Sequence, residues 1–181
     1  MPVIVSYIDL CDIVLPVAMH SDGSSKYTSF RKRRSLRLPC YDYSESRPYH
    51  ITWGTHARRR LLCREDLARA VIECIEAEAT RARVDLCAYC VIPDHVHVLL
   101  VPREGANVVR FTQSVKSRTA RSYCMLGGVG KLWQRGFYDH IVRREESVSR
   151  IAEYILANPV RAGIAENASA YPFSRSFLPP T

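Results

Sequence analysis

Apolar and polar residues alternate in several stretches of the chain, which is the pattern of half-buried β-strands. The first stretch, residues 49–55, reads Tyr-His-Ile-Thr-Trp-Gly-Thr and is rich in strand-forming residues. Residues 84–92 and 95–101 predict two further strands, joined at Pro93-Asp94, where the short spacing favours a tight antiparallel turn. Residues 137–143 predict a fourth strand.

Elsewhere apolar residues recur every three or four positions, which predicts amphipathic helices over residues 65–81 and about 107–124. A last helix follows a Ser147 cap and is expected to end at Asn158-Pro159, because a residue that precedes proline avoids the helical region. Tyr154 and Asn158 lie one turn apart on this helix, so they share a face.

The order strand, helix, strand, strand, helix, strand, helix predicts an α+β fold of the ferredoxin-like, split βαβ type with an antiparallel sheet. In this βαββαβ arrangement with an added C-terminal helix, two helices cover one sheet face and leave the other face free. We expect the domain to span residues 32–175, with a poorly ordered extension at 1–31 before it and a tail at 176–181 after it.

The composition favours a nucleic-acid partner and a reducing compartment. The 181 residues carry a formal charge of +8, which favours a polyanion over a merely solvated basic surface. Seven cysteines with irregular spacing indicate the cytoplasm rather than a disulfide framework. Cys87 and Cys90 lie inside a predicted strand, so we expect buried thiols rather than a zinc site. No stretch is long enough to span a membrane.

Two histidines in the third strand are the main candidates for chemistry. His95 and His97 are one residue apart and therefore point to the same sheet face. If the last helix roofs that face, it brings Tyr154 and Asn158 to the histidines. Two imidazoles and an amide oxygen form a three-ligand site with open positions, suited to Mg²⁺ or Mn²⁺ beside a phosphate. Tyr154 could then act as a covalent nucleophile.

Each of these residues also has a simpler interpretation. A His-x-His pair on a strand need not bind metal, and a tyrosine on a helix is often a core or surface residue. Asn158, placed before a proline, could cap the following turn. Tyr138 is a competing tyrosine, but it lies in strand-like sequence and has no candidate ligand four residues later.

Basic and aromatic residues offer contacts to DNA. Arginines are candidates for phosphate contacts. Trp133 and Gln134 suit base stacking and hydrogen bonding, although Trp133 could equally pack under a loop. The candidate DNA-contacting residues are Arg33, Arg34, Arg37, Arg58, Arg59, Arg60, Arg110, Arg121, Trp133, Gln134, His140 and Arg161.

Three segments carry a resemblance to a known family. They are Asp-His-Val-His at residues 94–97, Trp-Gln-Arg-Gly-Phe-Tyr-Asp-His at 133–140 and Ala-Glu-Tyr-Ile-Leu-Ala-Asn-Pro-Val-Arg-Ala-Gly at 152–163. Together they resemble the IS200-like, single-tyrosine HUH transposases, most closely the branch associated with REP palindromes. The opening at 33–44 also looks like that branch, so the resemblance covers about residues 33–175.

The resemblance implies roles for four residues. His95 and His97 would be metal ligands, Asn158 the third ligand and Tyr154 the nucleophile. The family cuts single-stranded DNA beside a hairpin, leaving a 5′-phosphotyrosine link and a free 3′-hydroxyl, and can rejoin ends. The expected cofactor is Mg²⁺ or Mn²⁺ and the expected partner a single-stranded DNA hairpin. A monomer and a homodimer are both compatible with the sequence.

Two other functional classes remain open at this point. A histidine-triad nucleotide hydrolase would need a third histidine where Leu99 stands. A non-catalytic protein that binds hairpin DNA or RNA on the same fold would need neither Tyr154 nor Asn158 nor a metal. Metal dependence therefore separates the enzyme from the binding protein.

Overall fold

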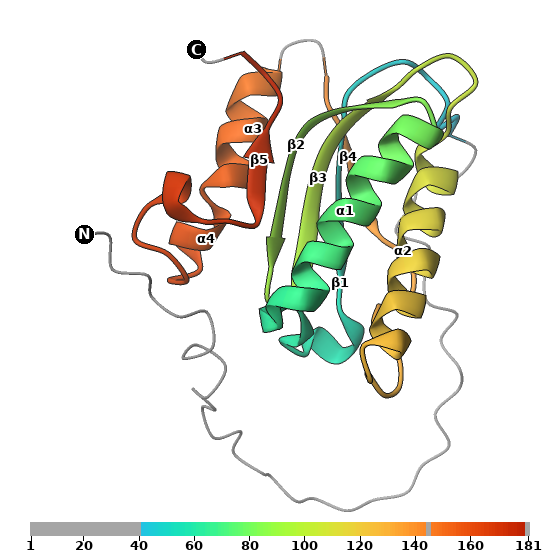
Figure 1. Cartoon of the computed structure of the whole chain (residues 1–181). Coiled ribbons are helices and arrows are strands. Elements are labelled where there is room, and N and C mark those ends of the chain that lie inside the picture. The colour runs from blue at the N-terminus through green and yellow to red at the C-terminus, as the bar shows by residue number, and fades with distance from the viewer. Residues whose placement is uncertain (1–40, 144–145, 180–181) are drawn as a thin grey trace, which may run out of the picture.

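A computed structural model describes residues 41–143 and 146–179 of the chain (Figure 1). The expected extension at 1–31 and the candidate residues Arg33, Arg34 and Arg37 lie outside this part. The strands are β1 (Tyr49–Gly54), β2 (Val84–Ile92), β3 (His95–Pro102), β4 (Tyr138–Ile141) and β5 (Ser174–Ser176). The helices are α1 (Glu65–Arg81), α2 (Val108–Met125), α3 (Val148–Leu156) and α4 (Asn158–Arg161). Short 3-10 helices cover His56–Arg58, Leu61–Cys63 and Ala168–Ala170.

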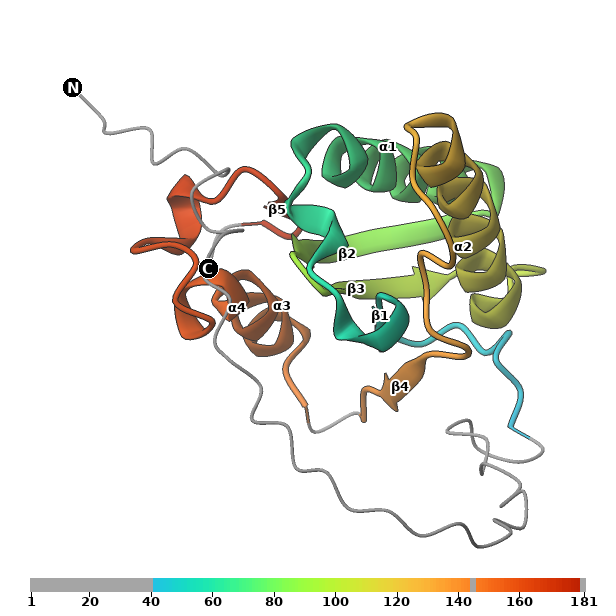
Figure 2. The ribbon, with the colours of Figure 1, turned by 90° about the horizontal axis from the view of Figure 1, so that it is seen from below.

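The strands form one antiparallel sheet in the order β4-β1-β3-β2-β5. Helices α1 and α2 cover one face of this sheet, and α3 lies on the opposite face (Figure 2). The first four strands with α1 and α2 form the split βαβ arrangement. The α+β class with an antiparallel sheet, expected from the order of elements, is confirmed.

The sheet is covered unequally. The apolar residues of β1, which are Tyr49, Ile51 and Trp53, are buried, whereas His50, Thr52 and Gly54 between them are only partly buried. In β2 and β3 almost every residue is buried, because α3 packs against these two strands from the side opposite α1. Strands covered on both faces lose the alternation and become continuously apolar. Among the described residues, no helix therefore covers the half of the sheet formed by β1 and β4 on the α3 side.

The end of the chain differs from the expectation in two places. The last helix ends at Leu156, and after Ala157 a second helix, α4, begins at Asn158. Proline is tolerated in the first turn of a helix, so Pro159 can be the second residue of α4 and still limit α3. After α4 the chain forms a strand that was not predicted, β5, which pairs with β2. The flanking Tyr171 and Phe173 are buried.

Helix α2 holds the loop that leads into β4. The ammonium group of Lys116 donates hydrogen bonds to the carbonyl oxygens of Gln134 and Gly136. Trp133 donates its indole N–H to Thr119 Oγ1 over 2.9 Å and contacts the ring of Trp53 edge-on. Trp133 is buried, so it packs under the loop, the simpler of the two interpretations left open for it.

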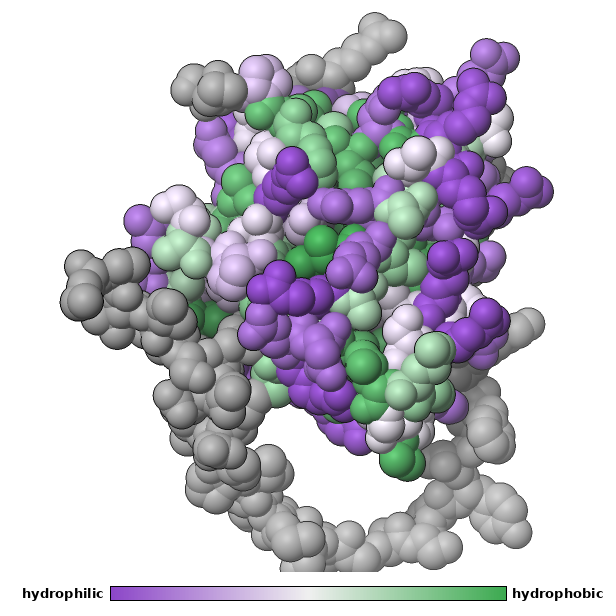
Figure 3. All heavy atoms as spheres, in the orientation of Figure 1, coloured by the Kyte–Doolittle hydropathy of each residue, from purple (hydrophilic) through white to green (hydrophobic). Residues whose placement is uncertain are grey.

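Hydrophilic side chains gather along one edge of the molecule. On the side seen in Figure 3, hydrophilic residues cover the outer edge formed by α2, and apolar residues show between the elements. Cys87 and Cys90 are buried free thiols in β2, as expected. Within residues 41–143 and 146–179, no helix combines the length and the hydropathy that crossing a bilayer requires.

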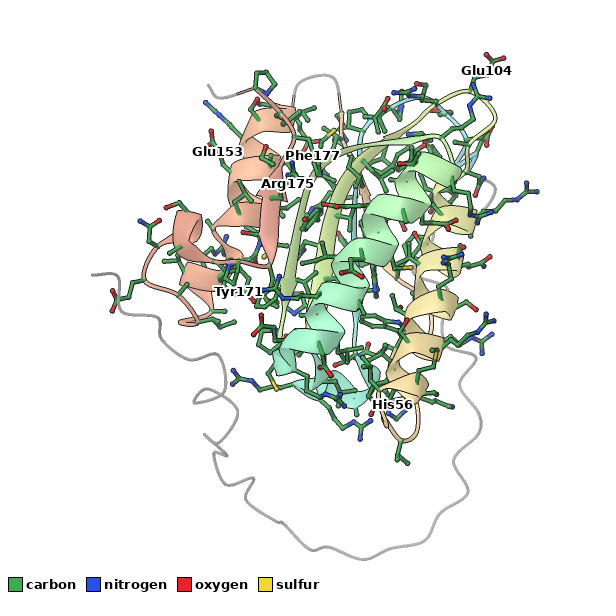
Figure 4. The ribbon with its side chains drawn as sticks, in the orientation of Figure 1. His56, Glu104, Glu153, Tyr171, Arg175 and Phe177 are labelled. Atoms are coloured by element: carbon green, nitrogen blue, oxygen red, sulfur yellow. The ribbon has the colours of Figure 1, made fainter. Side chains whose placement is uncertain are left out.

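We predict that Phe173→Ala lowers the free energy of unfolding by about 3–4 kcal/mol, because the Phe173 ring is only 1% exposed and its loss leaves a cavity. Urea denaturation followed by circular dichroism measures this. Phe177 is the matched control: it lies beside Arg175 at the outer edge of β5 (Figure 4) and is 41% exposed. Phe177→Ala should cost about 1 kcal/mol or less. Equal costs at both positions would contradict the role of Phe173 as the apolar anchor of β5.

We also predict a pH dependence from Lys116. Burial lowers the pKa of this amine from 10.5 to about 8 in the folded protein. Between these two values the unfolded chain binds the proton more tightly, so folding stability rises with pH. The stability of the wild type relative to Lys116→Met should therefore increase between pH 8 and 10, by up to about 3 kcal/mol at about 1.36 kcal/mol per unit of pKa. Denaturation at several pH values tests this, and a constant difference would refute it.

Candidate metal and nucleophile site

The histidine pair lies where the covered and the open halves of the sheet meet. His95 and His97 begin β3, directly after the turn at Pro93-Asp94, and they are opposite Gly54 and Thr52 of β1. His97 contacts His50, and the His50 ring meets Tyr154 of α3, so the pair lies on the sheet face against which α3 packs over β2 and β3. Figure 2 shows α3 on that face. His97 is 7% exposed, whereas His95 is only partly buried. The pair is thus sheltered on one side and reachable from the other.

The two imidazoles converge through the same nitrogen. The Nε2 atoms of His95 and His97 are 3.0 Å apart. On the far side of the rings, His95 Nδ1 lies 2.7 Å from Asp94 Oδ1, and His97 Nδ1 lies 2.9 Å from Thr52 Oγ1. An ionised carboxylate only accepts hydrogen bonds, so Asp94 keeps the proton of His95 on Nδ1 and leaves a lone pair on Nε2. Thr52 can do the same for His97.

This geometry suits a cation. Two lone pairs at 3.0 Å repel each other unless a positive charge lies near both. Metal-binding histidines usually donate their second N–H to a carboxylate or another acceptor, as both rings can here. Among the described residues, no three His, Cys, Asp or Glu side chains gather into a metal site. A third ligand drawn from the described residues would therefore be of another type.

Burial keeps His97 and its neighbour His50 in the neutral form. Burial, together with the neighbouring His95 and His50, lowers the pKa of His97 to about 3. Burial lowers the pKa of His50 to about 4. Both rings are therefore neutral at pH 7, the state that a ligand requires. Burial alone would raise the pKa of Asp94, but the hydrogen bond to His95 and the guanidinium of Arg58 hold it below its ordinary value.

The helical segment after β4 brings Tyr154 and Asn158 to this face. The Tyr154 ring lies edge-on to the His50 ring, with centroids 6.4 Å apart, and His50 Nε2 lies 3.1 Å from His97 Nδ1. Tyr154 is 45% exposed, so its hydroxyl can meet a large substrate. Asn158 donates its amide N–H groups to the carbonyl oxygens of Tyr154 and Ile155, which leaves Oδ1 as its acceptor. A carboxamide oxygen is a suitable third ligand for Mg²⁺ or Mn²⁺.

Arg58 and Gln134 lie at the histidine end of the sheet. The Arg58 guanidinium forms an ion pair of 3.0 Å with Asp94 and is 56% exposed. Ala57 and Arg58 both adopt a left-handed backbone, with φ of 57°, in the turn that follows β1. A Cβ at Gly54 would lie 3.2 Å from Gln134 Nε2 and 3.4 Å from an Arg58 nitrogen, so both side chains pass close over this glycine.

The remaining candidate DNA-contacting residues are divided between two faces. Arg59 and Arg60 are exposed beside Arg58, whereas Arg110 and Arg121 are exposed on α2, which covers the opposite sheet face. Two others lie on the histidine side. His140 is paired in register with His50 and contacts Glu146 over 2.9 Å, and Arg161 lies over the Tyr154 ring.

Two contacts of the histidine pair were not identified from the sequence. His50 and Thr52 both approach His97 Nδ1, yet neither was a candidate site residue. The alternation of β1 does place them on the polar side of the strand. Their position opposite His97 depends on the pairing of β1 with β3, which is not visible in local patterns.

Comparisons with known proteins identify the family of the chain. The family described as Transposase IS200 like matches residues 44–158. The REP-associated tyrosine transposase of Escherichia coli is 27% identical over 140 residues, covering 72% of this chain and 81% of that protein. A Haemophilus influenzae protein whose name also includes REP-associated tyrosine transposase is 26% identical over 98 residues. That match covers 48% of this chain and only 56% of the relative.

A solved structure has a similar fold. It is that of a REP-associated tyrosine transposase bound to a REP hairpin, with a TM-score of 0.63 and 21% sequence identity. The similarity covers 83% of this chain and 82% of that one. Because the family match alone extends over residues 44–158 of 181, well over half of the sequence, the chain belongs to the IS200-like transposase family.

Proposed function

We propose that this protein is a metal-dependent DNA transesterase that cleaves and rejoins single-stranded DNA near REP-like hairpins through Tyr154. The observation that carries the proposal is the convergence of the His95 and His97 Nε2 atoms, 3.0 Å apart, on the sheet face where the half-exposed Tyr154 contacts the neighbouring His50 ring. Family membership and the names of the relatives support a transposase. The solved neighbour is bound to a REP hairpin, which supports a DNA hairpin as the partner here.

His95 Nε2, His97 Nε2 and Asn158 Oδ1 would hold the cation, and we propose Mg²⁺ or Mn²⁺ because nitrogen and amide oxygen ligands with open positions suit these ions. When bound, such an ion acts as a Lewis acid on an oxygen of the scissile phosphate. Asp94 and Thr52 orient the two rings for this purpose.

Tyr154 supplies the nucleophile in this scheme. Its Oη attacks the phosphorus, the Oη–P bond forms as the P–O3′ bond breaks, the phenol proton passes to solvent, and the 3′-oxygen takes up a proton. The products are a 5′-phosphotyrosine and a free 3′-hydroxyl. In the reverse reaction a 3′-hydroxyl attacks the phosphotyrosine and rejoins the strand, so no external energy source is needed.

The open half of the sheet provides the DNA-binding surface. Arg58, Arg59 and Arg60 lie at the histidine end and can bind phosphates, and Gln134 beside Gly54 can hydrogen-bond a base edge. His140 lies across from His50 on the same surface. Trp133 contributes by supporting the loop from below, since its indole is buried. The net charge of +8 makes DNA binding salt-dependent. We also propose that the protein acts in the cytoplasm, where its DNA lies.

The first test is formation of a covalent adduct. We expect the wild type to form a denaturation-resistant complex with the 5′-phosphate side of a labelled hairpin oligonucleotide from the host's repeated palindromes, in Mn²⁺ and not in chelator. Tyr154→Phe should abolish the adduct, because the phenol oxygen is the attacking atom. Gel electrophoresis with 5′- and 3′-labelled strands measures both outcomes.

Tyr138→Phe is the matched control for this test. In the described part of the chain, Tyr138 is the other exposed tyrosine near the site, 56% exposed on β4, and its loss should leave the adduct intact. Tight hairpin binding without any adduct would support the non-catalytic binding protein. An adduct that survives Tyr154→Phe and disappears in Tyr138→Phe would assign the nucleophile to β4.

The second test concerns metal affinity without DNA. Thr52→Val keeps the shape of the side chain and removes the oxygen next to His97 Nδ1, so the ring loses the nearer of its two partners at that atom and keeps only His50. Loss of such an outer partner typically weakens metal binding by about 10–100-fold. We expect a decrease of about tenfold in Mn²⁺ affinity by calorimetry or electron paramagnetic resonance. Thr52→Ser retains the hydroxyl and should bind like the wild type, and equal affinity of the valine variant would refute this role.

A further inference from the structure

Arg161 makes a contact that a purely DNA-binding arginine does not need. Its guanidinium carbon lies 4.5 Å from the centroid of the Tyr154 ring. No ion pair within the described ranges involves Arg161, so its charge is not neutralised by an acidic side chain there. The His50 ring meets the same tyrosine edge-on, at an interplanar angle of 70°. The Tyr154 ring thus has two specific contacts although it is 45% exposed.

The backbone holds Arg161 in place relative to the tyrosine. Tyr154, Asn158 and Arg161 are four and three residues apart, which is the spacing of one continuous helical face. The side-chain amide of Asn158 donates to the backbone carbonyl of Tyr154 over 2.9 Å. The backbone N–H of Arg161 donates to the carbonyl of Ala157 over 3.0 Å. Pro159, between them, is buried and has a fixed φ. The junction of α3 and α4 therefore carries the proposed nucleophile Tyr154, the proposed metal ligand Asn158 and the Arg161 guanidinium as one unit.

A cation over the ring has a consequence for the reaction. As Tyr154 Oη gives up its proton and bonds to phosphorus, the ring passes through phenolate character, and in rejoining the phenolate is the leaving group. A positive charge on the face of an aromatic ring stabilises electron density in that ring. It acts in both directions, because forward and reverse reactions share one transition state.

We propose that Arg161 is a positioning residue for Tyr154, acting on the rate of phosphotyrosine formation rather than on DNA affinity. This inference rests on the proposed function, in which Tyr154 is the nucleophile. In this role Arg161 contacts the Tyr154 ring, whereas the role expected from the sequence is a contact to a DNA phosphate. A phosphate contact would act on affinity and its salt dependence, where each contact contributes about one unit to the slope of log affinity against log salt.

The experiment compares Arg161→Gln and Arg161→Lys with Arg150→Gln. Arg150 is the matched control, an exposed arginine on α3 that lies over no aromatic ring of the described segments. Hairpin affinity is measured at several salt concentrations in chelator, and adduct formation is measured as a single-turnover rate with Mn²⁺ and saturating DNA. The Tyr154 ring signals of the DNA-free, metal-free protein are followed by NMR, identified by their absence in Tyr154→Phe.

We expect Arg161→Gln to slow adduct formation at least tenfold, to leave affinity and salt slope unchanged within twofold, and to move the Tyr154 ring signals. Arg161→Lys should recover part of the rate, because an ammonium group can also lie over a ring. Arg150→Gln should match the wild type.

If Arg161→Gln instead binds the hairpin more weakly, with a lower salt slope and an unchanged rate of adduct formation at saturating DNA, the inference is overturned and Arg161 is a phosphate contact. Absence of any Tyr154-dependent adduct in the wild type would overturn the proposed function and this inference with it, whereas a normal rate in Arg161→Gln would overturn the inference alone.

Discussion

The antiparallel pairing of β1 with β3 is the constraint on which the site depends. It fixes which residues of the two strands are opposite each other, and so it places Thr52 against His97 and Gly54 against His95. A slip of one residue would turn His50 and Thr52 to the other sheet face and the apolar residues of β1 out of the core. The register is held by the burial of Tyr49, Ile51 and Trp53 beneath α1 and α2. Core packing on one face thus determines the hydrogen bonds on the other.

Local patterns in the sequence were sufficient for much of the fold. The helix expected at 65–81 has those bounds, and the second and third strands begin where alternation placed them. Such segments have strong periods and clear turn signals. β5 was missed because Ser174–Ser176 is short and polar, and it becomes a strand only by pairing with the edge of β2. Because β5 forms through pairing with a distant strand, the periodicity of the local sequence does not predict it.

The candidate site could be predicted in the same partial way. The face shared by His95 and His97 follows from strand geometry, and the face shared by Tyr154 and Asn158 follows from helix geometry. The partners of His97 could not be found, because His50 and Thr52 are more than 40 residues away in the chain. The environment of Trp133 was equally inaccessible. A tryptophan in a loop looks the same in sequence whether it faces solvent or, as here, donates to Thr119 under the loop.

The position of β5 has a consequence for how the molecule is made. Helix α3, which carries Tyr154, packs not only on β2 and β3 but also on β5, and β5 is the last strand in the described part of the chain. The backbone around β5 is fixed to β2 by hydrogen bonds from Val91 to Phe173 and from Phe177 to Cys87. During synthesis from the N-terminus, the surface that seats α3 is completed only after α3 itself has been made. The histidine strand can therefore form early in a nascent chain, whereas the tyrosine gains its final support only when residues 174–176 have emerged.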